Sequence, residues 1–598
     1  MPSYKAPVQD FLFLLNDVFD IDRYSNLAGF SDLTPDIVEA TLAEAARLSE
    51  EVLTPLNRVG DVEGCARHED ASVTTPKGFK DAYKQLGDGG WIGISAPTEF
   101  GGQGLPLVMG GIVSEFVDSA NLAFSVYPML SQGAISALID HGSEEQKATF
   151  LPNMICGKWT GTMNLTEAHC GTDLGMLRTK ATPQLDGSYR ITGTKIFISA
   201  GEHDLADNIV HLVLARIEGA PSGVHGISLF VVPKFIPNAD GSLGAQNAVS
   251  CGSIEHKMGI HGNCTCVMNY DDATGWLVGG VNRGLNAMFT MMNHERLGVG
   301  TQGVAISEVA YQNAAAYAKD RLQGRSGSGA QFPAKGADPI IVHPDVRRML
   351  MTIRALTEAS RALVVWTGLR HDIATRGGDE AARVQAEDHM GLLTPVIKGF
   401  CTDAGLTNAV LAQQVYGGHG YIAENGMEQF VRDARICQIY EGANGIQALD
   451  LVGRKLGMDG GRAVMAFFAE VERFLEAQVD DEGMAPYVKP AREALGHLQQ
   501  ATAWISKNAA TNRAEAGAAS YEYMNLFGLV ALGYMWCRMV ETAKRKLPGL
   551  TGAPAQHLGA KLVTGRFFME RLLPETAAHL ARIEAGSASM MELSAEAF

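Results

Sequence analysis

Residues 413–455 are the most informative part of this chain, and they read QQVYGGHGYIAENGMEQFVRDARICQIYEGANGIQALDLVGRK. A glycine-rich loop, a helical run around RDAR and the turn IYEG follow one another in this stretch. Glu441 lies in the turn just before Gly442, where a carboxylate can project into a cleft while apolar neighbours exclude water. Burial of this kind raises the pKa of a carboxylate toward the working pH, which makes it an effective general base.

A base in this setting is suited to a weakly acidic hydrogen, such as one on the carbon next to a carbonyl group. Its removal needs a carboxylate close by and hydrogen bonds to the carbonyl that stabilise the developing negative charge. Taken alone, Glu441 would be interpreted as a solvated turn carboxylate, because charged side chains are mostly exposed. Three patterns in this order rarely coincide by chance, so together they favour the base.

Two earlier stretches add to this interpretation. Residues 161–181 read GTMNLTEAHCGTDLGMLRTKA, and residues 193–201 read GTKIFISAG. In the second stretch Phe197 and Ser199 are two positions apart on an expected strand, so their side chains should face the same way. Each stretch has an ordinary alternative, since Thr-Glu before a turn is common at strand ends and an aromatic residue on a strand is usually core.

These stretches resemble the acyl-CoA dehydrogenase family, in which the same loop, Arg-Asp-Ala helix and turn occur in this order. The resemblance implies that FAD is the cofactor. Hydrogen bonds to the polar edge of its flavin ring would favour acceptance of a hydride. It places Thr166 and Thr172 at that edge, Phe197 against the flavin ring and Ser199 in a hydrogen bond to the ring. Thr172 stands where the family usually has serine.

The resemblance also implies contacts to CoA and to a neighbouring subunit. Residues 318–326, AKDRLQGRS, are similar to a family segment that reaches the FAD pyrophosphate of a second chain, a task for which the planar guanidinium group is suited. The chain is therefore expected to form at least a homodimer. Arg296 matches a CoA-contacting arginine, the alternative being a solvated helix arginine. The positions implied for the shared cofactor are Arg321, Gln323, Gln414, Gly417 and Gly418, and those implied for the substrate are Arg296, Tyr440 and Gly442.

The function that follows from the resemblance is FAD-dependent α,β-dehydrogenation of an acyl-CoA to the trans-2-enoyl-CoA, with an electron-transferring flavoprotein as acceptor. The extra residues at the two ends look like those of a longer branch of the family. Three departures from the family pattern concern the shape of the acyl pocket and the cofactor loop, namely Met163, Ala168-His169 and Gly324. The alternatives are a straight-chain fatty acyl-CoA dehydrogenase, an acyl-CoA oxidase and a non-catalytic scaffold.

The hydrophobic pattern predicts a mainly α fold with a central antiparallel β domain and an additional C-terminal helical domain. Apolar residues recur at helical spacing except in the central part, where short β-branched runs alternate with turn signals. The uncharged stretch 523–537 is too short to span a bilayer and is expected to be a buried helix. The predicted domains are an N-terminal extension 1–37, a helical domain 38–159, a β domain 160–280, a helical bundle 281–457 and the additional helical domain 458–598.

Composition narrows the function further. The chain has 598 residues and a net charge of −17, which disfavours nucleic acid and anionic membrane surfaces as partners. Its nine scattered cysteines indicate a reducing compartment, and the chain is expected to be cytoplasmic and not membrane-bound. No metal is expected. His256, His261, Cys264 and Cys266 offer a zinc site as an alternative, but a single Cys-x-Cys pair is not a standard ligand spacing and disfavours it.

Overall fold

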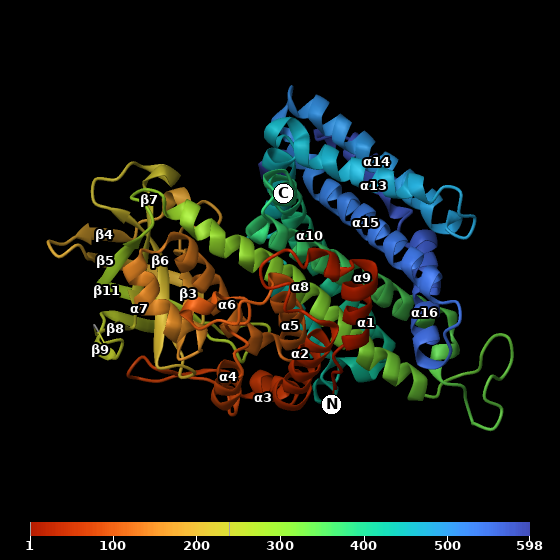
Figure 1. Cartoon of the computed structure of the whole chain (residues 1–598), viewed down its shortest axis with the longest axis horizontal. Helices are drawn as coiled ribbons and strands as arrows, with labels where there is room; N and C mark the ends of the chain where they lie inside the picture. Colours follow the sequence, from red (N-terminus) through yellow and green to blue (C-terminus); the bar gives the residue numbers. More distant parts are fainter. Residues whose placement is uncertain (1, 239) are drawn as a thin grey trace. The chain divides into compact units, whose positions relative to one another are not determined.

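The computed structural model describes residues 2–238 and 240–598 and separates the chain into two compact units (Figure 1). One unit consists of Met1–Ala43 and Val299–Phe598, and the other of Glu44–Gly298. The first is helical, whereas the second combines helices with the main β-sheet. Each unit is described below by itself.

Helices form the first half of the Glu44–Gly298 unit, and side-chain caps mark where two of them begin. The Asn121 side chain accepts a hydrogen bond from Phe124 N at the start of α6, and Ser143 and Gln146 form a capping box before α7. α6 is the one described helix long and apolar enough to cross a membrane, but 78% of its apolar window is buried, as in a core helix. The helices are α3 Thr54–Glu63, α4 Phe79–Asp88, α5 Leu107–Ala120, α6 Leu122–His141, α7 Glu144–Ile155 and the start of α8 Gly284–Asp320.

The main sheet of this unit has seven strands, and five of them pair in a closed ring, β5–β4–β6–β7–β11 and back to β5. The strands are β3 Trp159–Asn164, β4 Lys180–Pro183, β5 Tyr189–Ser199, β6 Asn208–Ile217, β7 Ile227–Pro233, β10 Val249–Ile254 and β11 Thr265–Val278. Two-stranded pairs are formed by β1 Ala66–Arg67 with β2 Val73–Thr74, and by β8 Phe235–Pro237 with β9 Leu243–Gln246.

The expectation of an antiparallel sheet holds for most strand pairs but is wrong for two of them. β6 runs parallel to both β3 and β4. The turn at residues 186–187 correctly signals the β4–β5 hairpin, which is antiparallel. Hairpin signals specify pairing only between strands that are neighbours in sequence. They could not reveal that the chain crosses over before β6 pairs with β3 and β4.

The other unit is a helical bundle to which the C-terminal helices add a further layer. α8 and α10 approach closely, since a Cβ added at Gly303 would lie 2.3 Å from the carbonyl oxygen of Cys401. Residues 523–537 lie within α15 and are mostly buried, which confirms the buried helix. The helices are α1 Val8–Leu12, α2 Pro35–Leu48, α9 Pro344–Arg376, α10 Glu380–Val415, α11 Met427–Cys437, α12 Asn444–Asp450, α13 Arg462–Ala477, α14 Ala485–Ala509, α15 Arg513–Lys546, α16 Gly552–Arg571, α17 Glu575–Glu584 and α18 Ala588–Met591.

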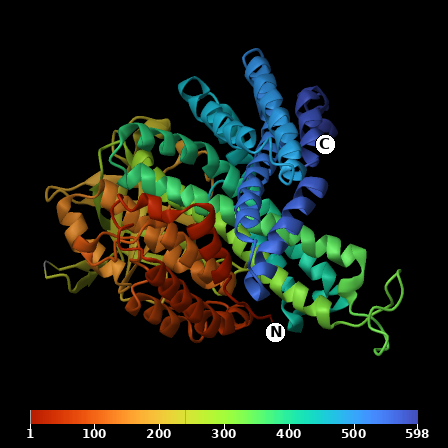
Figure 2. The ribbon, with the colours of Figure 1, turned by 45° about the vertical axis from the view of Figure 1, so that its right-hand side comes forward.

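The segment between α8 and α9 extends away from the helices of its own unit in both views (Figures 1 and 2). It is nevertheless ordered by one buried carboxylate, Asp338, which accepts hydrogen bonds from the backbone N–H groups of Ser326, Gln331 and Phe332 at 3.0, 3.2 and 2.8 Å. These hydrogen bonds lower the pKa of Asp338 to about 2. Residues 324–339 are therefore a mostly exposed insertion with a fixed internal structure.

Buried charges connect three parts of the helical unit that are remote in sequence. Asp10 of α1 accepts from Arg361 Nη1 of α9 at 2.9 Å and also pairs with Lys561 of α16. Arg361 Nη2 donates to Glu308 of α8 at 2.7 Å, and Lys561 Nζ donates to Glu358 of α9 at 3.0 Å. Burial would raise the pKa of Asp10, but Lys561 and Arg361 hold it well below its usual range.

Candidate active site

The loop that follows β3 is fastened to β5 by a buried ion pair. Glu167 Oε1 accepts from Lys195 Nζ at 2.9 Å and from the Thr179 hydroxyl at 2.7 Å, and Lys195 Nζ also donates to the Leu165 carbonyl at 2.9 Å. Glu167 is 5% exposed and Lys195 0%. Because Thr166 lies between Leu165 and Glu167, both of its sequence neighbours are held by the same ammonium group.

Both members of this ion pair are charged near neutral pH. Burial by itself would raise the pKa of Glu167, but Lys195 and the hydrogen bonds from Thr179 lower it to about 2. Burial lowers the pKa of Lys195 to about 8, against the opposing effect of Glu167. The charge of each residue is thus maintained by the other in a region with little water. Sequence reasoning missed this pair, although both residues lie within the two quoted motifs.

The predicted flavin-edge residues of this unit lie close in sequence to the Glu167–Lys195 ion pair. The Thr166 carbonyl accepts from Ile196 N at 2.9 Å, which places Thr166 beside the end of β5. Within residues 2–238 and 240–598, no hydrogen bond is recorded for the Thr166 N–H or hydroxyl group. The Ser199 carbonyl accepts from the Thr162 hydroxyl at 2.7 Å, and Thr172 is exposed in the same loop as Thr166. The structure therefore brings Thr166, Phe197 and Ser199 into one neighbourhood.

Phe197 differs from the expectation of a regular strand. Its backbone is left-handed, with φ 58°, and its side chain is 60% exposed. The β5–β11 register shifts between the Ile198–Cys266 and Lys195–Met268 pairs, so that a bulge interrupts the alternation of faces. The bulge therefore interrupts, at Phe197, the alternation on which the expectation for Phe197 and Ser199 rested.

These features fit a flat ring with a polar edge, which is the chemistry of a flavin. A large exposed aromatic ring is unusual on a strand and supplies a stacking surface. The Thr166 N–H and hydroxyl groups are donors not committed to the described protein atoms. A non-glycine residue held in a left-handed conformation is costly and is typical of functional sites. The residues of this unit thus suit the FAD that the sequence pattern implies.

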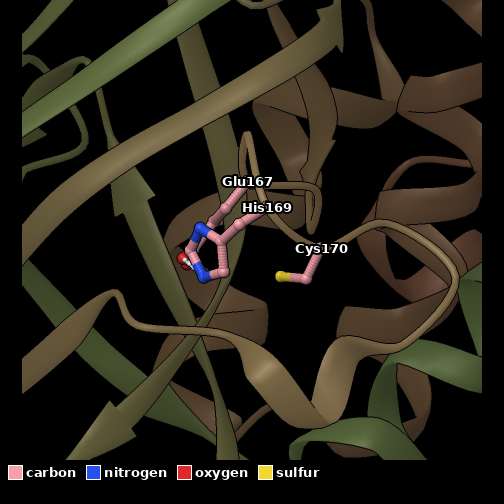
Figure 3. A group of neighbouring side chains, drawn as sticks. All are labelled: Glu167, His169 and Cys170. Atoms are coloured by element: carbon pink, nitrogen blue, oxygen red, sulfur yellow. Dashed lines mark ion pairs between the residues drawn. The ribbon is translucent and has the colours of Figure 1, made fainter.

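One group of side chains in the same loop is close enough to raise the question of a metal. Among the described residues, potential ligand atoms of Glu167, His169 and Cys170 all lie within 4.8 Å of one another (Figure 3). However, Glu167 is already bound by Lys195, and His169 Nε2 lies 3.0 Å from the Met176 carbonyl. A divalent cation would have to compete with the buried ammonium group for the Glu167 carboxylate.

In the described part of the chain, the four residues of the zinc alternative do not bring their ligand atoms together. The two ring nitrogens of His261 face the carbonyl oxygens of Asp61 and Lys257, at 2.9 and 2.8 Å, and His256 is exposed. The Cys264 thiol donates to a backbone carbonyl instead, that of Glu202, at 2.8 Å. The proximity of these residues in sequence therefore does not produce a cluster of ligands.

In the helical unit, the predicted base lies in a strained turn between α11 and α12. Glu441 has φ 55° and Gly442 has φ 80°, so two successive residues are left-handed. The Gln447 side-chain amide, on α12, donates to the carbonyl of Glu441 at 3.2 Å and to that of Gly442 at 3.1 Å. Glu441 is half-buried, and its Oε2 atom has no contact with solvent. The interpretation as a solvated turn carboxylate is thus wrong.

A buried polar network holds this turn from the other side. The side-chain oxygen of Asn444, Oδ1, accepts a hydrogen bond from Lys398 Nζ at 2.9 Å. The side-chain nitrogen, Nδ2, donates to Thr402 Oγ1 at 2.9 Å and to Asp403 Oδ1 at 2.7 Å. Lys398 is 0% exposed. Sequence reasoning missed these residues. The available signal was the spacing of Lys398 and Thr402, which places two polar groups on one face of an otherwise apolar helix.

The remaining predicted residues of the two units have contrasting surroundings. Arg296 is 8% exposed, with its guanidinium group over the Phe289 ring at 5.8 Å, so the alternative of a solvated helix arginine is wrong. The Tyr440 hydroxyl donates to Gln302 Oε1 on α8. All five residues predicted to contact the FAD of a second chain are exposed on the helical unit, namely Arg321, Gln323, Gln414, Gly417 and Gly418.

Family models cover most of the chain. They match the acyl-CoA dehydrogenase N-terminal domain at residues 40–158, the middle domain at 162–273 and the C-terminal domain at 282–456. Residues 467–594 match a domain described as acetyl-CoA dehydrogenase C-terminal like. The chain belongs to the acyl-CoA dehydrogenase family, and the protein is an FAD-dependent oxidoreductase that acts on acyl-CoA. The fold class expected from sequence is confirmed.

Individual relatives are similar over the full length. The chain is 45% identical to 3-methylmercaptopropionyl-CoA dehydrogenase of Ruegeria pomeroyi, over 97% of this chain and 98% of that one. It is 33% identical to the broad-specificity linear acyl-CoA dehydrogenase FadE5 of Mycobacterium tuberculosis, over 100% of both chains. Caenorhabditis elegans ACDH-11, solved in complex with C11-CoA, has a similar fold, with a TM-score of 0.76 and 19% identity over 96% of this chain and 92% of that one.

Proposed function

We propose that this enzyme oxidises 3-methylmercaptopropionyl-CoA to methylthioacryloyl-CoA, with Glu441 as the base that removes the α-proton. The reaction class is that of the family, and the choice of acyl group is supported by the relative of that name at 45% identity. The observation that carries the role of Glu441 is its half-buried carboxylate in a left-handed turn. Residues held in sparsely populated conformations cluster at active sites, so the strained turn supports this role when taken together with the burial of the carboxylate.

The proposal assigns roles to residues of each unit. Glu441 receives the α-proton, and the Gln447 amide keeps its backbone in place by binding the carbonyls of the turn. Thr166 offers its N–H and hydroxyl groups to the polar edge of the flavin ring, with Thr172 and Ser199 as further donors. Phe197 covers the flavin ring and excludes water. Bound FAD supplies the acceptor for the hydride that leaves the β-carbon.

The remaining contacts of the proposal concern CoA, the partner subunit and the acceptor. Arg296, Tyr440 and Gly442 are assigned to the acyl-CoA, and Arg321, Gln323, Gln414, Gly417 and Gly418 to the FAD of a second copy, so that the active form is at least a homodimer. Electrons pass to an electron-transferring flavoprotein. The nine cysteines, all free, support a reducing, cytoplasmic location without membrane attachment.

The role of Glu441 is tested by anaerobic mixing of the Glu441→Gln variant with 3-methylmercaptopropionyl-CoA. We expect flavin bleaching to slow by about three orders of magnitude, because general acid–base catalysis contributes roughly 10²–10⁴-fold and the glutamine amide cannot accept the proton. Glu387→Gln, an exposed glutamate on α10, is the matched control and should bleach at the parental rate. Bleaching of Glu441→Gln at the parental rate would contradict the assignment.

The acyl preference is tested by comparing 3-methylmercaptopropionyl-CoA with pentanoyl-CoA, in which a methylene replaces the sulfur. A higher kcat/KM for the thioether supports the proposal. The straight-chain alternative, favoured by the similarity to FadE5, predicts equal or higher kcat/KM for pentanoyl-CoA and for longer chains. Peroxide release at full turnover without a protein acceptor would instead favour an acyl-CoA oxidase.

A further inference from the structure

The N-terminal segment, residues 2–5, is bound to α8 through its backbone. Ser3 N donates to Asn313 Oδ1 at 2.9 Å, and Asn313 Nδ2 donates back to the Ser3 carbonyl at 2.8 Å. Lys5 N donates to Gln312 Oε1 at 2.9 Å, and Gln312 Nε2 donates to the Lys5 carbonyl at 2.7 Å. Two neighbouring side-chain amides thus act on the segment as an adjacent β-strand would.

Asn313 connects this segment to the start of the glycine loop, residues 416–426. The Asn313 carbonyl accepts from the Tyr416 hydroxyl at 3.3 Å. The Tyr416 ring stacks on Tyr317 of α8, with centroids 4.0 Å apart and an angle of 15° between the planes. The Tyr317 hydroxyl in turn lies 2.7 Å from His419 Nδ1. A continuous set of contacts therefore runs from Ser3 to the middle of the loop.

The far end of the glycine loop contacts the same N-terminal segment. Gly426 is left-handed, with φ 73°, and a Cβ added there would lie 2.8 Å from Cδ of Pro2. Between the two ends the loop is open, since a Cβ added at Gly417 or Gly418 would meet no atom within 4 Å. Gly417 is left-handed, with φ 57°, a conformation that by itself favours glycine. No φ or packing within the described chain explains the glycine at Gly418, where the open space leaves room for close approach of another molecule.

We propose that the N-terminal segment is a positioning element for FAD binding, which acts by bracing the glycine loop from both ends. Asn313 and Gln312 are the positioning residues, because they hold the segment without reaching the cofactor themselves. The inference rests on the proposed function, in which Gln414, Gly417 and Gly418 approach the FAD of a second copy. A braced loop lowers the ordering cost of binding, so loss of the brace should weaken FAD affinity without changing the chemical step.

The test uses the full chain with Asn313→Ala and Gln312→Ala combined. In the flavin-free protein, amides of residues 416–426 should exchange hydrogen faster than in the parent. The dissociation constant for FAD should rise roughly tenfold, which corresponds to about 1.4 kcal/mol. At saturating FAD the KM for acyl-CoA and kcat should return to parental values, a rescue that general misfolding would not give. Asn313→Asp keeps the acceptor for Ser3 N–H and should fall between parent and double variant.

Two controls separate this inference from the proposed function. Asn525→Ala removes a half-buried α15 amide whose hydrogen bond within the described residues is to the Tyr521 carbonyl of its own helix, and it should change neither exchange in the loop nor FAD affinity. Gly417→Val disturbs the loop directly and should lose FAD. If Gly417→Val binds FAD as the parent does, the assigned role of the loop is wrong and the inference falls with it. If only Gly417→Val loses FAD, while the double variant retains parental affinity, the bracing role alone is overturned.

Discussion

The left-handed backbone of Glu441 should lower the free energy of unfolding. Replacing Glu441 by glycine and by alanine distinguishes this backbone effect from the loss of the carboxylate. Both variants lack the base, so both should lose flavin bleaching. They differ in the turn, because φ 55° is left-handed, a conformation open to glycine but costly for alanine. The left-handed conformation costs a non-glycine residue about 1–2 kcal/mol, and the greater freedom of unfolded glycine offsets roughly 0.5–1 kcal/mol of the gain.

Glu441→Gly should therefore exceed Glu441→Ala in free energy of unfolding by about 1 kcal/mol, a factor of roughly five in the unfolding equilibrium. Urea titration of the two flavin-free variants measures the difference as a shift in midpoint at constant slope. Asp20→Gly is the control, since Asp20 is exposed and also left-handed, with φ 51°, and its change should stabilise without loss of activity. Equal midpoints for the glycine and alanine variants of Glu441, or a higher midpoint for alanine, would refute the claim that the turn is strained.

Four further outcomes follow from the buried contacts. Glu167→Gln leaves Lys195 buried without its counter-charge and should lower the free energy of unfolding by about 3–5 kcal/mol, measured in urea, whereas Lys195→Met with Glu167→Gln should recover much of this loss. The pKa of Glu167 is lowered from its ordinary value of 4.5 to about 2 in the folded protein. Its contribution to the free energy of unfolding is therefore present above pH 4.5 and is lost as the pH falls from 4.5 toward 2. Acid titration of the parent against the double variant should show this loss. Asp10→Asn leaves two buried cations underneutralised and should destabilise by about 3 kcal/mol or more, an effect absent if thermal unfolding is unchanged. Gly303→Ala places a methyl group 2.3 Å from the Cys401 carbonyl and should cost about 1–3 kcal/mol, and parental stability would show that the two helices can separate at no cost.

Sequence patterns were sufficient for the features that depend on near neighbours. Apolar residues at helical spacing identified the helices on both sides of the β domain, and the uncharged stretch in α15 was correctly expected to be buried. The IYEG turn was found for the same reason, because a glutamate before glycine is a local signal. These predictions need only the periodicity of a single element.

The missing parts depend on contacts between distant residues. The left-handed conformation of Glu441 is held by Gln447 on α12, which lies within the quoted stretch, but no local pattern marks its side chain as the partner of the turn carbonyls. The bulge at Phe197 arises from the register between β5 and β11. The parallel pairing of β6 likewise joins strands that are not consecutive. Register and crossover are properties of the folded sheet, and a short sequence window does not contain them.

The charge network around Asp10 has a consequence for the synthesis of the chain. Asp10 is made early, whereas Lys561 follows 551 positions later. At about 5–20 residues per second the ribosome needs roughly half a minute to two minutes to reach that lysine. The Glu44–Gly298 unit emerges complete in the interval, while the N-terminal helix waits for its partners. A nascent chain that stalls between these two positions can pair Asp10 with Arg361 but lacks Lys561, so the charge network of the helical unit is completed only when translation is nearly finished.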